Sequence, residues 1–170
     1  VFGQNVSIES GVTINSFCSI ENSIIKQGAS IGPFCRLRNG AEIGQYSKIG
    51  NFVEIKNSSL SEGVKVSHLS YIGDAEIGEN SNIGAGTITC NYDGVDKHKT
   101  TIGKRAFIGS NSSLIAPLSI GDDANIAAGS SISKDVESGS LAITRAPIKF
   151  ISNWSKKLRK SSSEEEKCAE

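Results

Sequence analysis

The chain has 170 residues and a formal net charge of zero, so it is long enough for one or two domains and gives no indication of binding to nucleic acid or to a membrane surface. No stretch of about 18 apolar residues occurs and no signal peptide is visible, so we expect no transmembrane helix. The four cysteines lack the CxxC spacing of a zinc site and indicate reduced thiols in a cytosolic protein.

Aliphatic residues return every six residues along most of the chain. A period of six fits neither the helical period of 3.6 nor a long alternating strand, and it is typical of a parallel β-helix built from hexapeptides. We therefore predict an all-β triangular solenoid in which three short strands make one coil and successive coils stack about 4.8 Å apart. The two longest runs are Ile25, Ile31, Leu37, Ile43, Ile49 and Ile55, and Ile102, Ile108, Leu114, Ile120, Ile126 and Ile132.

The fifth position counted from each aliphatic residue is small or compact, which predicts that it shares the crowded interior. These residues are Cys35, Ala41, Ser47, Val53, Ser59, Ser70, Ser81, Thr87, Ala106, Ser112, Ala124 and Ser130. The phase slips by one residue at three places, and each slip predicts a coil one residue shorter than three full hexapeptides. The slips lie between Ile20 and Ile25, Ile55 and Leu60, and Ile72 and Ile77. Cys18 and Cys35 are one such shortened coil apart, and we interpret them as core fillers in adjacent coils rather than a disulfide.

The repeat has one interruption and an end. Residues 89–100, TCNYDGVDKHKT, are polar with a turn signal at Asp93-Gly94, and they predict a loop inserted into a β-helix domain of residues 1–136. Residues 137–154 look irregular, and the charged, serine-rich residues 155–170 predict a disordered tail. The chain has no methionine, even at position 1, and its first coil would present an uncapped edge, so we expect the natural protein to begin further upstream.

Arg38 and Lys56 are 18 residues apart in one unslipped run, so they should stack on the same outer face, one coil apart. Two neighbouring cations favour a bound anion, and a phosphate suits the fork of an arginine and the point charge of a lysine. The alternative is two solvated surface charges. Glu54 lies two residues before Lys56 on the same strand, and a pair between these two is the default interpretation.

His68 occupies a corner position and should be exposed. Its side-chain type has an unperturbed pKa close to neutrality, which suits a general base, although a lone surface histidine is usually without a role. Tyr71 and Asn82 fall in the following coils and could supply hydrogen bonds or be ordinary surface residues. We expect the imidazole to lie near both Arg38 and Lys56. His98 is assigned no role.

Several segments in order resemble one family. They are GPFCRLRNGAEIG, IGNFVEIK, HLSYIGDAEIG, NIGAGTITCNYDG, KHKT, SLIAPLSIG and ITRAP, from about Ile31 to Trp154. The chain is similar to the C-terminal domain of the bifunctional bacterial N-acetylglucosamine-1-phosphate uridyltransferase/glucosamine-1-phosphate acetyltransferase. The family's uridyltransferase domain, which uses Mg²⁺, is absent from this sequence.

The resemblance implies a left-handed β-helix that forms a cytoplasmic, bacterial homotrimer with three active sites between subunits. It implies acetyl transfer from acetyl-CoA to the amine of glucosamine-1-phosphate, with no metal in this domain. The product would feed the synthesis of UDP-N-acetylglucosamine, the precursor of peptidoglycan and lipopolysaccharide.

The resemblance also implies roles for individual residues. His68 matches the catalytic base and Glu54 an acidic partner near it. The positions matching sugar-phosphate and sugar contacts are Arg38, Lys56, Tyr71, Asn82 and Lys97. The positions matching the acetyl-CoA site are Ala85, Asn91, Tyr92, Ser110, Ala128 and Arg145.

The implied chemistry is attack of an amine on a thioester. His68 would accept a proton from the amine, with Glu54 or a backbone carbonyl fixing its tautomer. Backbone N–H groups near Gly84-Ala85 could stabilise the charge that develops on the thioester oxygen. No side-chain nucleophile is required.

Three other functions are known for such a solenoid or follow from its pattern. A γ-type carbonic anhydrase needs three histidines on zinc, and this chain has two histidines. An ice-binding or purely structural β-helix would show regular outward rows of threonine on a flat face, whereas the faces here are charged and irregular. A hexapeptide acetyltransferase acting on a different amino sugar stays open.

Overall fold

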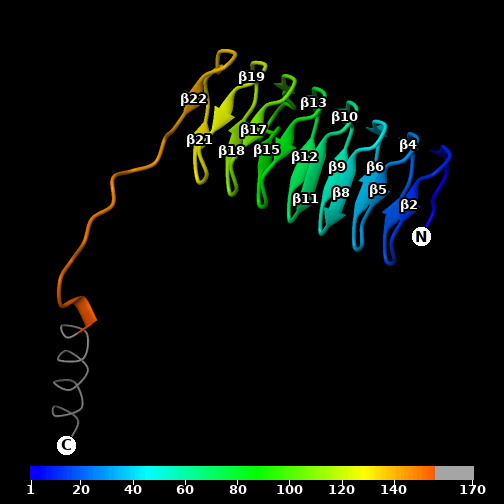
Figure 1. Ribbon diagram of the computed structural model, residues 1–170, viewed down its shortest axis with the longest axis horizontal. Helices are drawn as coiled ribbons and strands as arrows, with labels where there is room; N and C mark the ends of the chain where they lie inside the picture. The colour runs from blue at the N-terminus through cyan, green and yellow to red at the C-terminus, as the bar shows by residue number, and fades with distance from the viewer. Residues whose placement is uncertain (156–170) are drawn as a thin grey trace, which may run out of the picture.

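The computed structural model describes residues 1–155, which form 22 strands in three parallel sheets. The sheets are the three sides of the predicted left-handed parallel β-helix, so the predicted fold class is confirmed. Figure 1 shows the coils stacked side by side from the blue N-terminal coil to β22, after which the chain leads away from the stack. Within residues 1–155, no helix reaches the length and hydrophobicity that crossing a bilayer would require.

Each coil contributes one strand to each side of the prism, and we name the sides in chain order. Face 1 consists of β1 (Val6–Ile8), β4 (Ser23–Ile25), β7 (Ala41–Ile43), β10 (Ser59–Leu60), β13 (Ala75–Ile77), β16 (Thr100–Ile102) and β19 (Leu118–Ile120). Face 2 consists of β2 (Thr13–Ile14), β5 (Ser30–Ile31), β8 (Lys48–Asn51), β11 (Lys65–His68), β14 (Asn82–Ile83), β17 (Phe107–Ile108), β20 (Asn125–Ile126) and β22 (Leu141–Ala142). Face 3 consists of β3 (Ser19–Ile20), β6 (Arg36–Arg38), β9 (Glu54–Lys56), β12 (Tyr71–Gly73), β15 (Ile88–Cys90), β18 (Ser113–Ile115) and β21 (Ser131–Ile132).

The coil lengths follow the predicted slips. On face 1 the register between β4 and β7 spans three full hexapeptides, whereas the registers between β1 and β4, between β7 and β10 and between β10 and β13 are each one residue shorter. The coil that contains the insertion is longer, and it pairs Ile88 with Ser113. The stack stays in register because the extra residues leave the prism as a loop. Strand β15 runs to Cys90 and β16 begins at Thr100, so this connection is Asn91–Lys99.

The core is a ladder of stacked aliphatic side chains, and every member of the two long runs is buried. The small positions are buried as predicted with one exception, Ser59, which is exposed while Ser58 is buried. Side chains two residues apart on a strand share a face, so the interior position is the one two residues before the next aliphatic residue. At the slip before Leu60 that position is Ser58. Cys18 and Cys35 are buried and free, as predicted.

Replacing Ile49 by alanine tests the ladder. Ile49 is fully buried between Ile31 and Val66 of the adjacent coils. We expect the free energy of unfolding to fall by about 2–5 kcal/mol, since the substitution removes apolar contacts and leaves a cavity. Chemical denaturation measures the change. The matched control is Ile24→Ala on the outward side of β4, which should cost well under half as much. Equal losses for the two variants would contradict the ladder.

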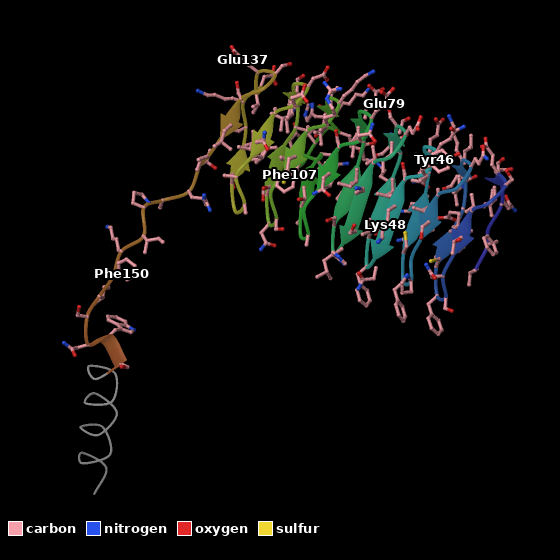
Figure 2. All side chains as sticks on the ribbon, in the orientation of Figure 1. Tyr46, Lys48, Glu79, Phe107, Glu137 and Phe150 are labelled. Carbon is pink, nitrogen blue, oxygen red and sulfur yellow. The ribbon has the colours of Figure 1, made fainter. Side chains whose placement is uncertain are left out.

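The end of the solenoid differs from the expectation in one respect. The repeat was expected to finish near Val136, but β22 pairs with β20 and adds a strand within the segment expected to be irregular. From Ile143 to Ile151 the chain has no regular secondary structure. Figure 2 shows Phe150 on this segment, away from the solenoid, and its side chain is 90% exposed. The predicted disordered tail, residues 155–170, lies outside the described residues except for its first residue.

Candidate functional site

Arg38 and Lys56 lie side by side on face 3. They end strands β6 and β9, and the strand register places them directly opposite each other. Both side chains are largely withdrawn from solvent, with exposed fractions of 24% for Arg38 and 9% for Lys56. The predicted stacking of the two cations on neighbouring coils is confirmed.

Each cation has its own carboxylate partner. Arg38 Nε donates to Glu54 Oε1 at 2.7 Å, and Lys56 Nζ donates to the two Asp74 carboxylate oxygens at 2.7 and 2.9 Å. The expected pair between Glu54 and Lys56 is wrong. Glu54 is level with Arg36 and Tyr71, whereas Lys56 is nearer the corner at which Asp74 follows β12.

Asp74 is the polar residue that the sequence reasoning missed. Besides Lys56, its carboxylate accepts hydrogen bonds from the side-chain amides of Asn57, at 2.5 Å, and Asn91. Burial raises the pKa of Asp74, but the hydrogen bonds from Asn57, Lys56 and Asn91 outweigh it, so the net pKa lies below its ordinary value. Asp74 follows Lys56 by 18 residues and Asn57 by 17, and this coil spacing could have revealed it.

His68 ends β11 and is exposed, as predicted. Its Nδ1 lies 2.8 Å from Oδ1 of Asn51, the residue opposite it in β8. A carbonyl oxygen accepts hydrogen bonds, so Nδ1 carries the proton and Nε2 keeps its lone pair free for a substrate. The partner that fixes the tautomer is thus Asn51, and the expectation of Glu54 or a backbone carbonyl is wrong. Gly50 makes the approach possible, because a Cβ there would overlap the Ser67 carbonyl oxygen of the next coil.

Within one chain, the imidazole of His68 lies apart from the two cations. His68 lies at the corner where face 2 meets face 3, whereas Lys56 is level with Gly73 at the other edge of face 3. The chain from His68 to Gly73 turns this corner at Leu69, so it spans less than the roughly 16 Å that five residues of straight strand would cover. Within one chain, the register therefore places His68 and the two cations at opposite edges of face 3, whereas the sequence led us to expect them close together.

Five of the predicted positions line up along one edge of the prism. Backbone hydrogen bonds link successive coils there, from Gly86 N–H to the His68 carbonyl at 3.4 Å, from Asn111 N–H to Ala85 at 2.8 Å and from Gly129 N–H to Ser110 at 2.8 Å. Ala128 immediately precedes Gly129, and Arg145 Cδ would lie 3.7 Å from a Cβ at Gly129. The edge therefore carries, in order, His68, Ala85, Ser110, Ala128 and Arg145.

Tyr71 and Asn82 occupy different sides. Tyr71 begins β12 on face 3, opposite Glu54, and helps to line a groove of about 390 Å³ together with Phe52 and Leu69. Asn82 begins β14 on face 2, in the row between Lys48 and Phe107 that Figure 2 labels. One chain does not bring these two residues together.

The inserted loop covers part of face 1. Lys97 lines a groove of about 560 Å³ with Asp74 and Asn57, so the loop reaches the corner that holds Lys56. Asn91, at the start of the loop, is buried, and Tyr92 is exposed. The loop is closed on itself by Asp93, whose carboxylate lies 2.7 Å from His98 Nε2.

Replacing Asp93 by asparagine is expected to loosen the loop. Hydrogen bonds from His98 first, and then from the backbone N–H groups of Asp96 and Val95, hold the pKa of Asp93 well below its ordinary range. A depressed folded-state pKa means that the stabilisation is present above the unfolded value near 4 and is lost only as the pH falls towards the folded value.

We therefore expect tryptic cleavage after Lys97 at pH 8 to be several-fold faster in Asp93→Asn than in the parent. Limited proteolysis followed by mass spectrometry measures both. The control is Asp96→Asn, since Asp96 contributes its main chain to these bonds. Equal cleavage rates for the two variants would count against the role of the carboxylate.

Comparison with known proteins shows which proteins this chain is similar to. Residues 19–92 match the family described as the GMPPB C-terminal domain, and residues 99–134 match the hexapeptide repeat of succinyl-transferase. The bifunctional protein GlmU of Zymomonas mobilis is 59% identical over 158 residues, which are 93% of this chain and 35% of the relative. That of Sphingopyxis alaskensis is 51% identical over 171 residues, covering 98% and 38%.

The chain matches the C-terminal acetyltransferase domain of the GlmU proteins. It spans about a third of the length of these curated GlmU relatives. Among solved structures it is similar to the polysialic acid O-acetyltransferase OatWY, with a TM-score of 0.48, 14% identity and coverage of 89% of this chain and 91% of that one. It is also similar to the polySia-specific acetyltransferase NeuO, with a TM-score of 0.44, 17% identity and coverage of 97% and 98%.

Proposed function

We propose that this domain transfers the acetyl group of acetyl-CoA to the amine of glucosamine-1-phosphate, yielding N-acetylglucosamine-1-phosphate for the synthesis of UDP-N-acetylglucosamine. The observation that carries the proposal is the register of Arg38 and Lys56 on adjacent strands of face 3. A guanidinium and an ammonium group at that separation provide a fork and a point charge for one phosphate. The GlmU match supports the same reaction.

Acetyl-CoA is proposed to lie along the edge that begins at His68, and Asn91 and Tyr92, at the opposite edge of face 3, would reach it from a neighbouring copy of the chain. Ala85, Ser110 and Ala128 are small, so a long pantetheine arm can approach the backbone there, one coil at a time. Arg145, at the far end of the row, offers a cation to the phosphates of CoA. This direction puts the thioester near Ala85 and beside His68.

His68 acts as the general base in the proposed mechanism. Its free Nε2 accepts a proton from the amine as the nitrogen attacks the thioester carbonyl, so that the CoA thiolate leaves and the acetyl group forms an amide. The charge on the thioester oxygen needs a donor. The Gly84 N–H already donates to the Ile108 carbonyl at 2.8 Å, so the Ala85 N–H is the better candidate of the pair expected from the sequence. No step uses a metal or an acyl-enzyme.

The reaction requires more than one copy of the chain. Because His68 and the Arg38–Lys56 pair lie at opposite edges of face 3, a sugar phosphate held by the pair does not reach the base of the same chain. A neighbouring copy that presents its His68 edge to this face completes the site. We therefore propose the homotrimer, with one site at each junction, that the resemblance implies. Asn82 on face 2 and Tyr71 on face 3 could then meet across a junction.

A thiol-release assay with acetyl-CoA tests the proposal. Glucosamine-1-phosphate, glucosamine-6-phosphate and glucosamine are compared as acceptors at equal concentrations. We expect kcat/KM to be at least about tenfold higher for glucosamine-1-phosphate, since the charged contacts to phosphate are each worth about 1.5–3 kcal/mol. Turnover that is equal with glucosamine would refute the phosphate site, and a preference for another phosphorylated amino sugar would favour the alternative acetyltransferase.

A further inference from the structure

Asp74 is the centre of a polar cluster that the proposed mechanism does not use. It lies at the corner after β12, with its side chain 11% exposed. Its backbone is fixed on both sides, because its N–H donates to the Lys56 carbonyl at 3.1 Å and its carbonyl accepts from the Thr100 N–H at 3.1 Å. The coils therefore determine where the carboxylate stands.

The donors that converge on this carboxylate come from different parts of the proposed site. Lys56 comes from face 3, where it binds the sugar phosphate, and Asn91 comes from the start of the inserted loop, where it is assigned to acetyl-CoA. Asn57 is the remaining donor and has no assigned ligand. One partly buried acceptor thus connects a residue of each substrate site.

We propose that Asp74 is a positioning residue that orients Lys56 and Asn91 together and so couples the sugar-phosphate and acetyl-CoA sites. The inference rests on the proposed function for the identity of the two ligands. Asp74 touches neither ligand and acts through the two residues that do.

The charge balance supports orientation rather than attraction. Around the proposed phosphate the two cations are offset by two carboxylates, Glu54 on Arg38 and Asp74 on Lys56. A carboxylate beside a phosphate weakens the binding of that anion. Asp74 restricts the rotamers of Lys56. A lysine side chain has large rotamer freedom, and here two hydrogen bonds to Asp74 hold it in place before the ligand binds.

The test is Asp74→Asn in the full chain, with both Michaelis constants measured by thiol release. Asparagine is isosteric and tolerates the left-handed backbone at this position, where φ is 50°. We expect the KM values for sugar phosphate and for acetyl-CoA each to rise about 3- to 30-fold. The thermal midpoint should also fall, because Lys56 loses its carboxylate partner, so both constants are measured well below the midpoint of the variant. Lys56→Gln should raise the KM for sugar phosphate alone, and Asn91→Ala the KM for acetyl-CoA alone. A merely structural role would reduce the folded fraction and leave both KM values unchanged.

A matched control makes the same chemical change elsewhere. Asp123 accepts two hydrogen bonds from Arg105 at 2.7 Å and has a similar φ of 57°, but it lies outside the site. Asp123→Asn should leave both KM values within twofold of the parent. Asp74→Asn with one KM or neither altered, in a protein that is folded at the assay temperature, would overturn the inference.

A second variant tests the inference if Asp74→Asn does not fold. Asn57→Gly removes one donor to Asp74 without altering Lys56 or Asn91, and glycine adopts the positive φ of 47° readily. It should raise both KM values by a smaller factor, and unchanged values would overturn the inference. Calorimetric titrations with CoA and with inorganic phosphate distinguish a failure of the proposed function from a failure of the coupling by Asp74. A parent that shows no turnover defeats the proposed function, whereas coupled losses of CoA and phosphate binding in Asp74→Asn would still support the coupling.

Discussion

Replacing His68 by alanine is expected to lower kcat by about 10²–10⁴-fold while leaving the fold intact. The loss is that of a general base whose Nε2 is free and whose Nδ1 is fixed by Asn51. His68 is exposed at a corner and contributes no core packing, so the thermal midpoint and the oligomeric state should be nearly unchanged. Steady-state thiol release gives kcat, and analytical ultracentrifugation gives the oligomeric state.

Asn51 offers a graded control for this experiment. Asn51→Ala leaves the imidazole in place but removes the acceptor that keeps the proton on Nδ1. We expect a fall in kcat of about tenfold, clearly smaller than that of His68→Ala, because solvent can replace the amide at an exposed position. A kcat for His68→Ala equal to that of the parent would remove the base from the mechanism. A larger loss for Asn51→Ala would indicate a different reacting group.

Replacing Arg38 by alanine is expected to raise the KM for the sugar phosphate by about 10- to 100-fold with a much smaller change in kcat. The guanidinium would make charged hydrogen bonds to the phosphate, each worth about 1.5–3 kcal/mol, and these bonds exist before and during acetyl transfer. The KM for acetyl-CoA should stay within twofold, since the proposed CoA edge lies on the far side of face 3.

Arg36 is the matched control, because it lies on the same strand and faces Glu54 at 3.9 Å but is level with Glu54 rather than with Lys56. Arg36→Ala should leave the KM for sugar phosphate within twofold. The same KM for the parent and for Arg38→Ala would refute the clamp. Comparable increases for both arginines would mean that the phosphate senses a diffuse positive field rather than the Arg38–Lys56 pair.

The period of six made most of the fold predictable. Strand alternation fixes which side chains point inward, and the coil length of three hexapeptides then fixes which residues lie on top of one another. The spacing of one full coil between Arg38 and Lys56 predicted that they are neighbours. The spacing of one shortened coil between Cys18 and Cys35 predicted that both are buried in adjacent coils. Ser59 was predicted to be buried because its position was counted forward from Ile55. Counting back two residues from Leu60 gives Ser58, which is the buried residue.

The loop and the corners were less predictable, because hydrogen bonds there depend on directions that a repeat does not encode. Asp74 was missed although its spacing from Lys56 was available, since a carboxylate at a corner can turn towards any of several neighbours. The partner of His68 turned out to be Asn51, one coil away. Both pairings are decided by side-chain rotamers at the left-handed corner turns.

The sequence alone determined the stacking order, and hence the neighbours of every residue along the axis of the prism, because a solenoid repeats one local rule. Only the tertiary structure decided the relations across the prism. These are the separation of His68 from the Arg38–Lys56 pair by the width of a face, the line of Ala85, Ser110 and Ala128 along one edge, and the convergence of two proposed ligand sites on Asp74. The physical reason is that such relations depend on where the chain turns each corner and which polar groups meet there.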